Sequence, residues 1–161
     1  MSNNKQIQLA LEIATLAHKG AQRRNGDIYM MHVMRVATNK QYVKTKAAQA
    51  AAFLHDVVED TSFTFDQLRT MGVSDDVINI LRLLTKDSDL SYEDYIAHLC
   101  ESENTDAMQV KLSDLHDNLD QSTLTSISDQ DYERFAKYKQ AQSKILSRIL
   151  ELDFELFKKI S

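Results

Sequence analysis

Residues that favour turns are scarce in this chain. Proline is absent from its 161 residues, and the three glycines are Gly20, Gly26 and Gly72. Because a many-stranded sheet needs frequent turns, this composition favours a helical domain. The single cysteine, Cys100, excludes an intramolecular disulfide and suits a reducing cytosol. We therefore expect a helical protein that works in the cytoplasm.

Long apolar runs and an excess of positive charge are missing as well. No apolar stretch approaches the roughly 20 residues that span a bilayer, so we expect no membrane contact. The N-terminal residues MSNNKQIQLALEIA lack the basic and apolar regions of a secretory signal. The net charge of −5 is opposite in sign to that of most nucleic-acid binders, so duplex backbone is not an expected partner. A small anionic ligand is compatible with this charge if basic residues gather locally.

Apolar residues recur at three- and four-residue spacing along most of the chain, which is typical of amphipathic helices. Thr64 and Gln67 fit a capping box that starts a short helix ending at Gly72. No segment alternates with a two-residue period, and no repeat or linker divides the chain. The prediction is one compact all-α bundle over residues 1–161. Its main helices are expected at about 4–19, around Met31 to Ala37, 45–58, 75–84, 92–102, 106–120 and 129–150, with a last short helix after them.

Residues 52–63, AFLHDVVEDTSF, place four ionisable side chains in an apolar run. Such side chains are rarely buried unless they are paired or bind a metal. On a continuous helix His55 lies one turn from Glu59, and Asp56 one turn from Asp60. The segment thus offers two adjacent metal ligands and two carboxylates that could accept a proton. An ordinary polar helix end would explain the same four residues.

Two further residues could complete a metal site. His32 opens the second helix between apolar neighbours, where a histidine is more often a satisfied core residue. Asp114 lies in a helix whose apolar pattern predicts burial, and a buried aspartate needs a compensating cation. Together with His55 and Asp56 they would form a set of two nitrogens and two oxygens. Such ligands suit Mn²⁺ or Fe²⁺ and would admit Zn²⁺.

The order H…HD…D resembles the signature of the HD-domain metal-dependent phosphohydrolases. The similarity is greater to one branch, the alarmone hydrolases of the RelA/SpoT type, which include short stand-alone enzymes. The segments that carry it follow family order and span most of the chain. They are AHKGAQRRNGDIYMMH at 17–32, AAFLHDVVEDTSFT at 51–64, LLTK at 83–86 and VKLSDLHDNLD at 110–120.

This resemblance implies a metal site and a catalytic pair. A single Mn²⁺ would be held by four ligands, with Glu59 and Asp60 orienting and activating the attacking water. The implied ligands are His32, His55, Asp56 and Asp114. His18, His98 and His116 receive no role, and one metal is preferred over two.

The resemblance also implies residues that contact the substrate. Arg23 and Arg24 match basic residues that meet the nucleotide, and Asn118 matches an asparagine that faces the nucleoside. Arg134 and Tyr138 keep an R-x-x-x-Y spacing found in short members, where both reach the substrate. An ordinary half-exposed helix pair is an equal explanation for these last two residues.

Some positions depart from the family pattern. Ile28 and Val33 stand where proline is usual, and the common run D-R-L-H-N reads Asp114-Leu115-His116-Asp117-Asn118. No ligand is lost, so these changes bear on substrate fit rather than on metal binding. The length leaves no room for a synthetase domain, so degradation is the expected reaction.

Three functions follow from these residues. The first is Mn²⁺-dependent hydrolysis of the 3′-diphosphate of the guanine nucleotides ppGpp and pppGpp, giving GDP or GTP and pyrophosphate in the stringent response. The second keeps the metal site but acts on another nucleotide, such as NADPH or a modified alarmone, as the altered residues around Asp117 and Gln121 suggest. The third is a low-turnover nucleotide-binding or antitoxin-like protein, which would not need both Glu59 and Asp60. The sequence leaves the oligomeric state open.

Overall fold

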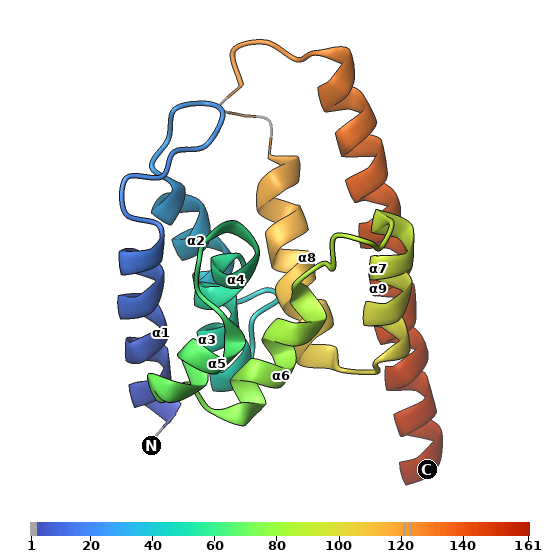
Figure 1. Ribbon diagram of the computed structural model, residues 1–161. Coiled ribbons are helices and arrows are strands. Elements are labelled where there is room, and N and C mark those ends of the chain that lie inside the picture. The colour runs from blue at the N-terminus through green and yellow to red at the C-terminus, as the bar shows by residue number, and fades with distance from the viewer. Residues whose placement is uncertain (1–2, 121, 123) are drawn as a thin grey trace.

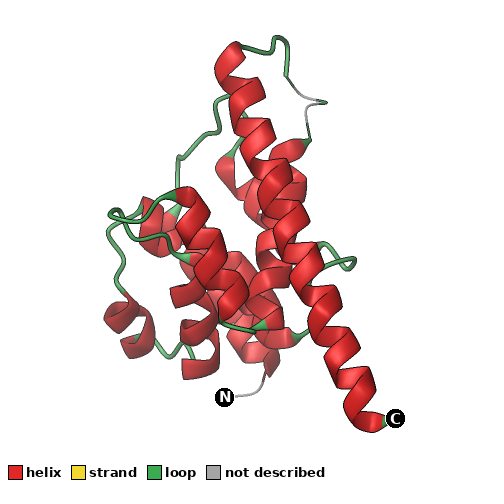
Figure 2. Cartoon of the chain, turned by 90° about the vertical axis from the view of Figure 1, so that its right-hand side faces the viewer, coloured by secondary structure: helices red, strands yellow, loops and turns green. Residues whose placement is uncertain are grey.

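A computed structural model describes residues 3–120, 122 and 124–161, and its regular structure is helical (Figures 1 and 2). Within these residues the only strand-like pairing is a single antiparallel bridge between Gln22 and Ile28. The all-α prediction is confirmed. The helices are α1 (Asn3–Ala17), α2 (Tyr29–Thr38), α3 (Lys46–Leu54), α4 (Val57–Asp60), α5 (Phe65–Thr70), α6 (Asp75–Leu84), α7 (Tyr92–Glu101), α8 (Thr105–Leu119) and α9 (Asp129–Ile160).

Helix ends follow the capping residues of the sequence. The capping box at α5 is present, with Thr64 and Gln67 satisfying each other's backbone N–H groups. Ser91 caps α7 by accepting from the backbone N–H of Asp94. Gly72 ends its turn with φ of +102°, a conformation that side chains with a Cβ rarely adopt.

Two expected helices differ from the observed ones. The helix expected over 45–58 stops at Leu54, and α4 begins at Val57, because Asp56 adopts φ −107° and ψ −2°. The helix expected over 129–150 does not end there, and no separate last helix follows. Instead α9 runs unbroken to Ile160, since no glycine or proline interrupts it. From residue 153 to 161 every residue is exposed, and the end of α9 extends past the other helices (Figure 1).

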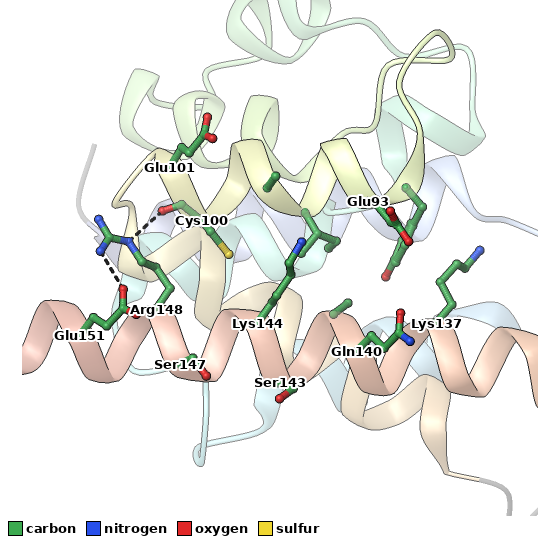
Figure 3. A pocket seen from close by; sticks show the side chains of 14 residues that line it. Glu93, Cys100, Glu101, Lys137, Gln140, Ser143, Lys144, Ser147, Arg148 and Glu151 are labelled. Atoms are coloured by element: carbon green, nitrogen blue, oxygen red, sulfur yellow. Dashed lines mark hydrogen bonds and ion pairs between the residues drawn. The ribbon is translucent and has the colours of Figure 1, made fainter.

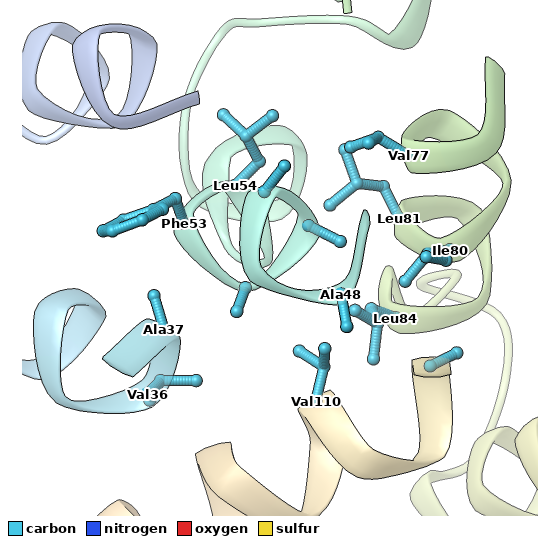
Figure 4. Packing of buried hydrophobic residues seen from close by; sticks show 14 of the residues in the cluster. Val36, Ala37, Ala48, Phe53, Leu54, Val77, Ile80, Leu81, Leu84 and Val110 are labelled. Carbon is cyan, nitrogen blue, oxygen red and sulfur yellow. The ribbon is translucent and has the colours of Figure 1, made fainter. Parts of the chain in front are cut away.

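The core is built around α3, whose alanines at 48, 50, 51 and 52 are fully buried. Small side chains let α1, α2, α6 and α8 pack closely against this helix. Val36, Leu81 and Val110 converge on it from α2, α6 and α8 (Figure 4). The tight packing fixes the end of α3, where the charged cluster of the sequence begins. None of the described helices combines the length and apolar composition needed to cross a membrane.

Candidate metal centre

The four predicted ligands converge on one point between α2, the α3–α4 junction and α8. His55 Nε2 lies 2.9 Å from Asp56 Oδ2 and 3.5 Å from Asp114 Oδ1. His32 Nε2 lies 3.4 Å from Asp114 Oδ1 and 3.8 Å from Asp56 Oδ2. Atoms that bind one ion at about 2.1 Å each lie at most about 4.2 Å apart. His32, His55 and Asp56 each offer an atom within 4.8 Å of the other two, a group that could hold one cation. Asp114 lies beside this group, because its Oδ1 is within 3.5 Å of both imidazoles.

Hydrogen bonds fix which nitrogen of each imidazole faces the cluster. His55 Nδ1 lies 2.7 Å from the carbonyl oxygen of Ala52 and His32 Nδ1 lies 2.6 Å from Asp117 Oδ2, so each Nδ1 donates a proton. Each Nε2 of a neutral ring then keeps its lone pair, and both Nε2 atoms point into the cluster. His55 Nε2 is buried without a hydrogen-bond partner. A metal-binding histidine shows this same arrangement, so the residues present fit a divalent cation.

The electrostatics of the cluster favour positive charge. Burial lowers the pKa of His55, but Asp56 and Asp114 outweigh it and hold the pKa well above its usual value. Burial raises the pKa of Asp114, yet Lys111 and the two imidazoles bring it well below the ordinary range. The pKa of Asp56 is lowered as well, because His55 outweighs burial. Two ionised carboxylates in a buried place need a cation between them.

The two predicted proton acceptors lie beside the cluster on α4. Glu59 Oε2 accepts a hydrogen bond from the backbone N–H of Lys86 at 3.3 Å. Asp60 Oδ2 lies 3.5 Å from the hydroxyl of Tyr29, which also donates a short hydrogen bond to Asp56. Partial burial raises the pKa of Glu59 and of Asp60, and the charge of Asp56 adds to the rise for both. A raised carboxyl pKa makes a better proton acceptor near neutral pH.

Two adjoining cavities contain the predicted substrate residues. One, of about 390 Å³, contains the cluster together with Glu59 and Asp60. The other, of about 310 Å³, is lined by Arg24 and Arg134 among others. Four residues line both cavities, so the two cavities adjoin in the space beside the cluster. These shared residues are Arg23, Tyr29, Asn118 and Tyr138.

Three arginines of this space are already bound to carboxylates or amides. Arg23 donates to Asp117 at 3.2 Å and to Asn118 at 3.0 Å. Arg24 and Arg134 both form ion pairs with the fully buried Asp131, at 2.6 and 2.7 Å. Asp131 therefore joins the loop before α2 to the first turn of α9.

Sequence reasoning gave no role to several residues that hold the cluster. Lys111 donates to Asp114 Oδ2 at 2.7 Å, and its place three residues earlier on the same helix was a usable signal. Tyr29 binds Asp56, and Asp117 binds His32, but these contacts span 27 and 85 residues and leave no local signal. His116 is exposed and lies near Tyr42, away from the cluster. Gln121 lies outside the described residues.

A larger cavity lies elsewhere. It is a groove of about 870 Å³ between α7 and α9, and none of the predicted site residues lines it (Figure 3). Arg148 on its edge is paired with Glu151 at 3.1 Å and bonds the carbonyl of Cys100. Tyr92 and Lys137 line both this groove and the cluster cavity.

The chain is similar to proteins of alarmone metabolism. No family model matches it. It is 36% identical over 69 residues to a GTP pyrophosphokinase of Streptomyces coelicolor, covering 42% of this chain and 8% of that protein. It is 28% identical over 122 residues to a guanosine-3′,5′-bis(diphosphate) 3′-pyrophosphohydrolase of Aquifex aeolicus, covering 71% of this chain and 17% of that protein. The chain thus spans less than a fifth of the length of either relative.

A solved structure shares the whole fold. It belongs to a metazoan ortholog of SpoT described as hydrolysing ppGpp and acting in starvation responses. The TM-score is 0.72 at 24% identity, with 97% of this chain and 96% of that chain covered. The chain therefore has the helical fold of this hydrolase, and the resemblance read from its motifs is confirmed.

Proposed function

We propose that this protein is a cytoplasmic, metal-dependent hydrolase that removes the 3′-diphosphate of ppGpp or pppGpp, leaving GDP or GTP and pyrophosphate. The observation that carries the proposal is the convergence of His32, His55, Asp56 and Asp114 beside two carboxylates with raised pKa values. The Aquifex relative and the metazoan protein, which are named for this reaction, support it. The Streptomyces relative is named for synthesis, but the match covers only 8% of it.

The ligand set favours Mn²⁺, with Fe²⁺ or Zn²⁺ as substitutes. A bound dication would lower the pKa of its water, in favourable cases from 15.7 to about 7, and neutralise phosphoryl charge. The protein residues then have two tasks. The imidazoles and carboxylates of the cluster keep the ligand atoms in place, and Glu59 and Asp60 handle the proton of the attacking water.

Glu59 and Asp60 divide the work on water. Asp60 is close to the Tyr29 hydroxyl, which in turn is bound to the ligand Asp56. Asp60 therefore lies next to a side chain that contacts the metal cluster, which suits a residue that orients water. Among the described residues, the Glu59 carboxylate accepts one hydrogen bond, from the backbone N–H of Lys86 to Oε2. We assign Glu59 as the proton acceptor.

The nucleotide occupies the space that the two adjoining cavities form beside the cluster. Its combined size falls in the range of about 300–1,000 Å³ that is usual for ligand sites. The nucleoside contacts Arg23, Asn118 and Tyr138, and the 3′-diphosphate points to the cluster. Lys86 and Lys137 line the cluster cavity, so basic side chains gather at the site although the whole chain carries a net charge of −5.

One observation favours a second nucleotide substrate. Asp117 holds Arg23 and Arg35 in ion pairs, so a carboxylate stands near the place where the nucleotide would bind. In the family pattern this position is a histidine, so the aspartate changes the charge next to the nucleotide. A different nucleotide, such as NADPH or a modified alarmone, would suit this change. A protein that only binds nucleotides is disfavoured, because binding alone does not require Glu59 and Asp60 beside the ligands.

A nucleotide panel tests these alternatives. Purified protein is loaded with Mn²⁺ and incubated with ppGpp, pppGpp, NADPH and deoxynucleotides, and the released pyrophosphate and phosphate are quantified. Pyrophosphate and GDP from ppGpp support the proposal. Phosphate from NADPH alone supports the second substrate, and a ppGpp-dependent rise in melting temperature without turnover supports a binding protein. The Glu59→Gln variant serves as the control for contaminating activity.

A further inference from the structure

Asp117 lies on α8, one turn beyond the ligand Asp114, and is buried. Its carboxylate accepts hydrogen bonds from three basic side chains. His32 Nδ1 lies 2.6 Å from Oδ2, Arg35 Nε lies 2.5 Å from Oδ1, and Arg23 Nη1 lies 3.2 Å from Oδ2. Among the described residues no other carboxylate joins a predicted ligand to two arginines.

These contacts are part of a hydrogen-bond network that surrounds the cluster. Arg23 donates from Nη2 to Asn118 Oδ1 at 3.0 Å, and Asn118 Nδ2 donates to the ligand Asp114 at 2.8 Å. The path therefore runs from His32 through Asp117, Arg23 and Asn118 to Asp114. Two ligands are linked through an arginine that the sequence assigns to the nucleotide.

We propose that Asp117 is a positioning residue for both the metal ligand His32 and the substrate residue Arg23. It keeps the proton of His32 on Nδ1, so that Nε2 keeps its lone pair and faces the cluster. Metal-binding histidines are commonly held this way by a carboxylate on the other nitrogen. The same carboxylate holds Arg23 at the junction of the two cavities. The inference rests on the proposed metal site and, for Arg23, on the proposed function.

The charge of Asp117 explains a departure from the family pattern. In the run D-R-L-H-N the place of Asp117 is a histidine. An imidazole there would face His32, Arg35 and Arg23 with at most one acceptor nitrogen, whereas a carboxylate offers two oxygens with about four lone pairs. Arg35 is half-exposed and its guanidinium bonds both oxygens. The aspartate and these two arginines therefore form one hydrogen-bonded unit with a net charge of +1.

The Asp117→Asn variant tests the positioning of His32. It keeps the shape of the side chain but removes one acceptor and the charge. Isothermal titration calorimetry of metal-stripped protein should show an Mn²⁺ dissociation constant raised by about 10–100-fold, the usual effect of losing such a partner. Asp153→Asn, with the same charge change on the exposed end of α9, should stay within twofold of wild type. Long-range ¹H–¹⁵N spectra should change His32 from a single Nδ1–H tautomer to a mixture, with its signals assigned by their loss in His32→Gln.

Arg23→Gln separates the two roles of Asp117. This variant should raise KM for the nucleotide and leave Mn²⁺ affinity unchanged, while Asp117→Asn should alter both. If wild-type protein hydrolyses no nucleotide, the proposed function fails, but Mn²⁺ affinity and the His32 tautomer still judge the role of Asp117. If Asp117→Asn does not fold, the double variant Asp117→Asn/Arg35→Gln takes its place in every assay. The second substitution removes Arg35, the cation that loses its partner when Asp117 loses its charge. An Mn²⁺ affinity within twofold of wild type together with an unchanged His32 tautomer would overturn the proposal.

Discussion

Two cavities of this protein differ in size and in the state of their charges. The groove between α7 and α9, at about 870 Å³, is more than twice as large as the cluster cavity, at about 390 Å³. Charged groups of the groove lie at the surface, as Lys144 does, or pair with each other, as Arg148 and Glu151 do (Figure 3). In the cluster cavity Asp114 and His55 are buried. Buried charge is costly unless it is compensated, so the smaller cavity, and not the larger one, is the candidate for the proposed metal chemistry.

Removing a ligand should have the largest effect. Asp114→Asn removes the negative charge of the ligand and leaves one oxygen where two served, Oδ1 beside the imidazoles and Oδ2 as the acceptor for Lys111. We expect kcat/KM to fall by at least about 10³-fold, because the variant loses the dication that lowers the pKa of water. Wild-type protein should gain about 2.7 kcal/mol of unfolding free energy at Mn²⁺ concentrations near 100 times the dissociation constant. The melting temperature of the variant should not rise with Mn²⁺, and an Mn²⁺-dependent rise equal to that of wild type would contradict the ligand assignment.

The next largest effect belongs to the carboxylates on α4. Glu59→Gln should lower kcat by about 10²–10⁴-fold, the usual contribution of a general base, while Mn²⁺ affinity stays unchanged. Asp60→Asn should cost less, because an amide oxygen can still accept a hydrogen bond from the water that we assign Asp60 to orient. Single-turnover rates and calorimetric Mn²⁺ titration of both variants test the order. A larger loss in Asp60→Asn would reverse the two roles.

Much of the site was predictable from sequence because its signals are local or follow a fixed order. His55 and Asp56 are adjacent, and Asp114 lies in a helix whose apolar pattern predicts burial. The break between α3 and α4 was not predictable from propensity. Asp56 leaves the regular helix where its carboxylate meets the Tyr29 hydroxyl and His55. Such contacts depend on tertiary packing and not on neighbouring residues.

The partners of the arginines were also hidden in the sequence. Arg24 meets Asp131 across 107 residues, and Arg23 meets Asp117 across 94. The family resemblance assigned these arginines to the nucleotide, and nothing in the spacing showed that carboxylates hold them in place. The unbroken course of α9 beyond residue 150 escaped prediction for another reason. The break expected after residue 150 had no glycine or proline to cause it, and the helix continues to Ile160.

Arginines of the second cavity should differ in their effect on substrate binding. Arg23→Gln should raise KM by about 10–100-fold, as expected when a hydrogen bond to a charged group worth about 1.5–3 kcal/mol is lost. Arg134→Gln should raise KM less, because Arg134 lines only the second cavity, whereas Arg23 also lines the cluster cavity. Steady-state kinetics with ppGpp test this order. Equal effects of the two variants would show that a position in the cluster cavity gives Arg23 no additional part in substrate binding.

The smallest effects should come from substitutions of two lysines of α9, which allow a direct comparison of the two cavities. Lys137 and Lys144 both line the large groove, but only Lys137 also lines the cluster cavity. Lys137→Gln should raise KM for ppGpp a few-fold, as expected for an exposed cation whose interactions are worth about 0.2–1 kcal/mol. Lys144→Gln should leave kcat/KM within twofold of wild type, and neither variant should shift the melting temperature measurably, since surface substitutions change stability by about 0.5 kcal/mol or less. Because the two lysines lie on the same helix and undergo the same change, a difference between them isolates the contribution of the cluster cavity. An equal loss in Lys144→Gln would instead show that the groove between α7 and α9 also contacts the substrate.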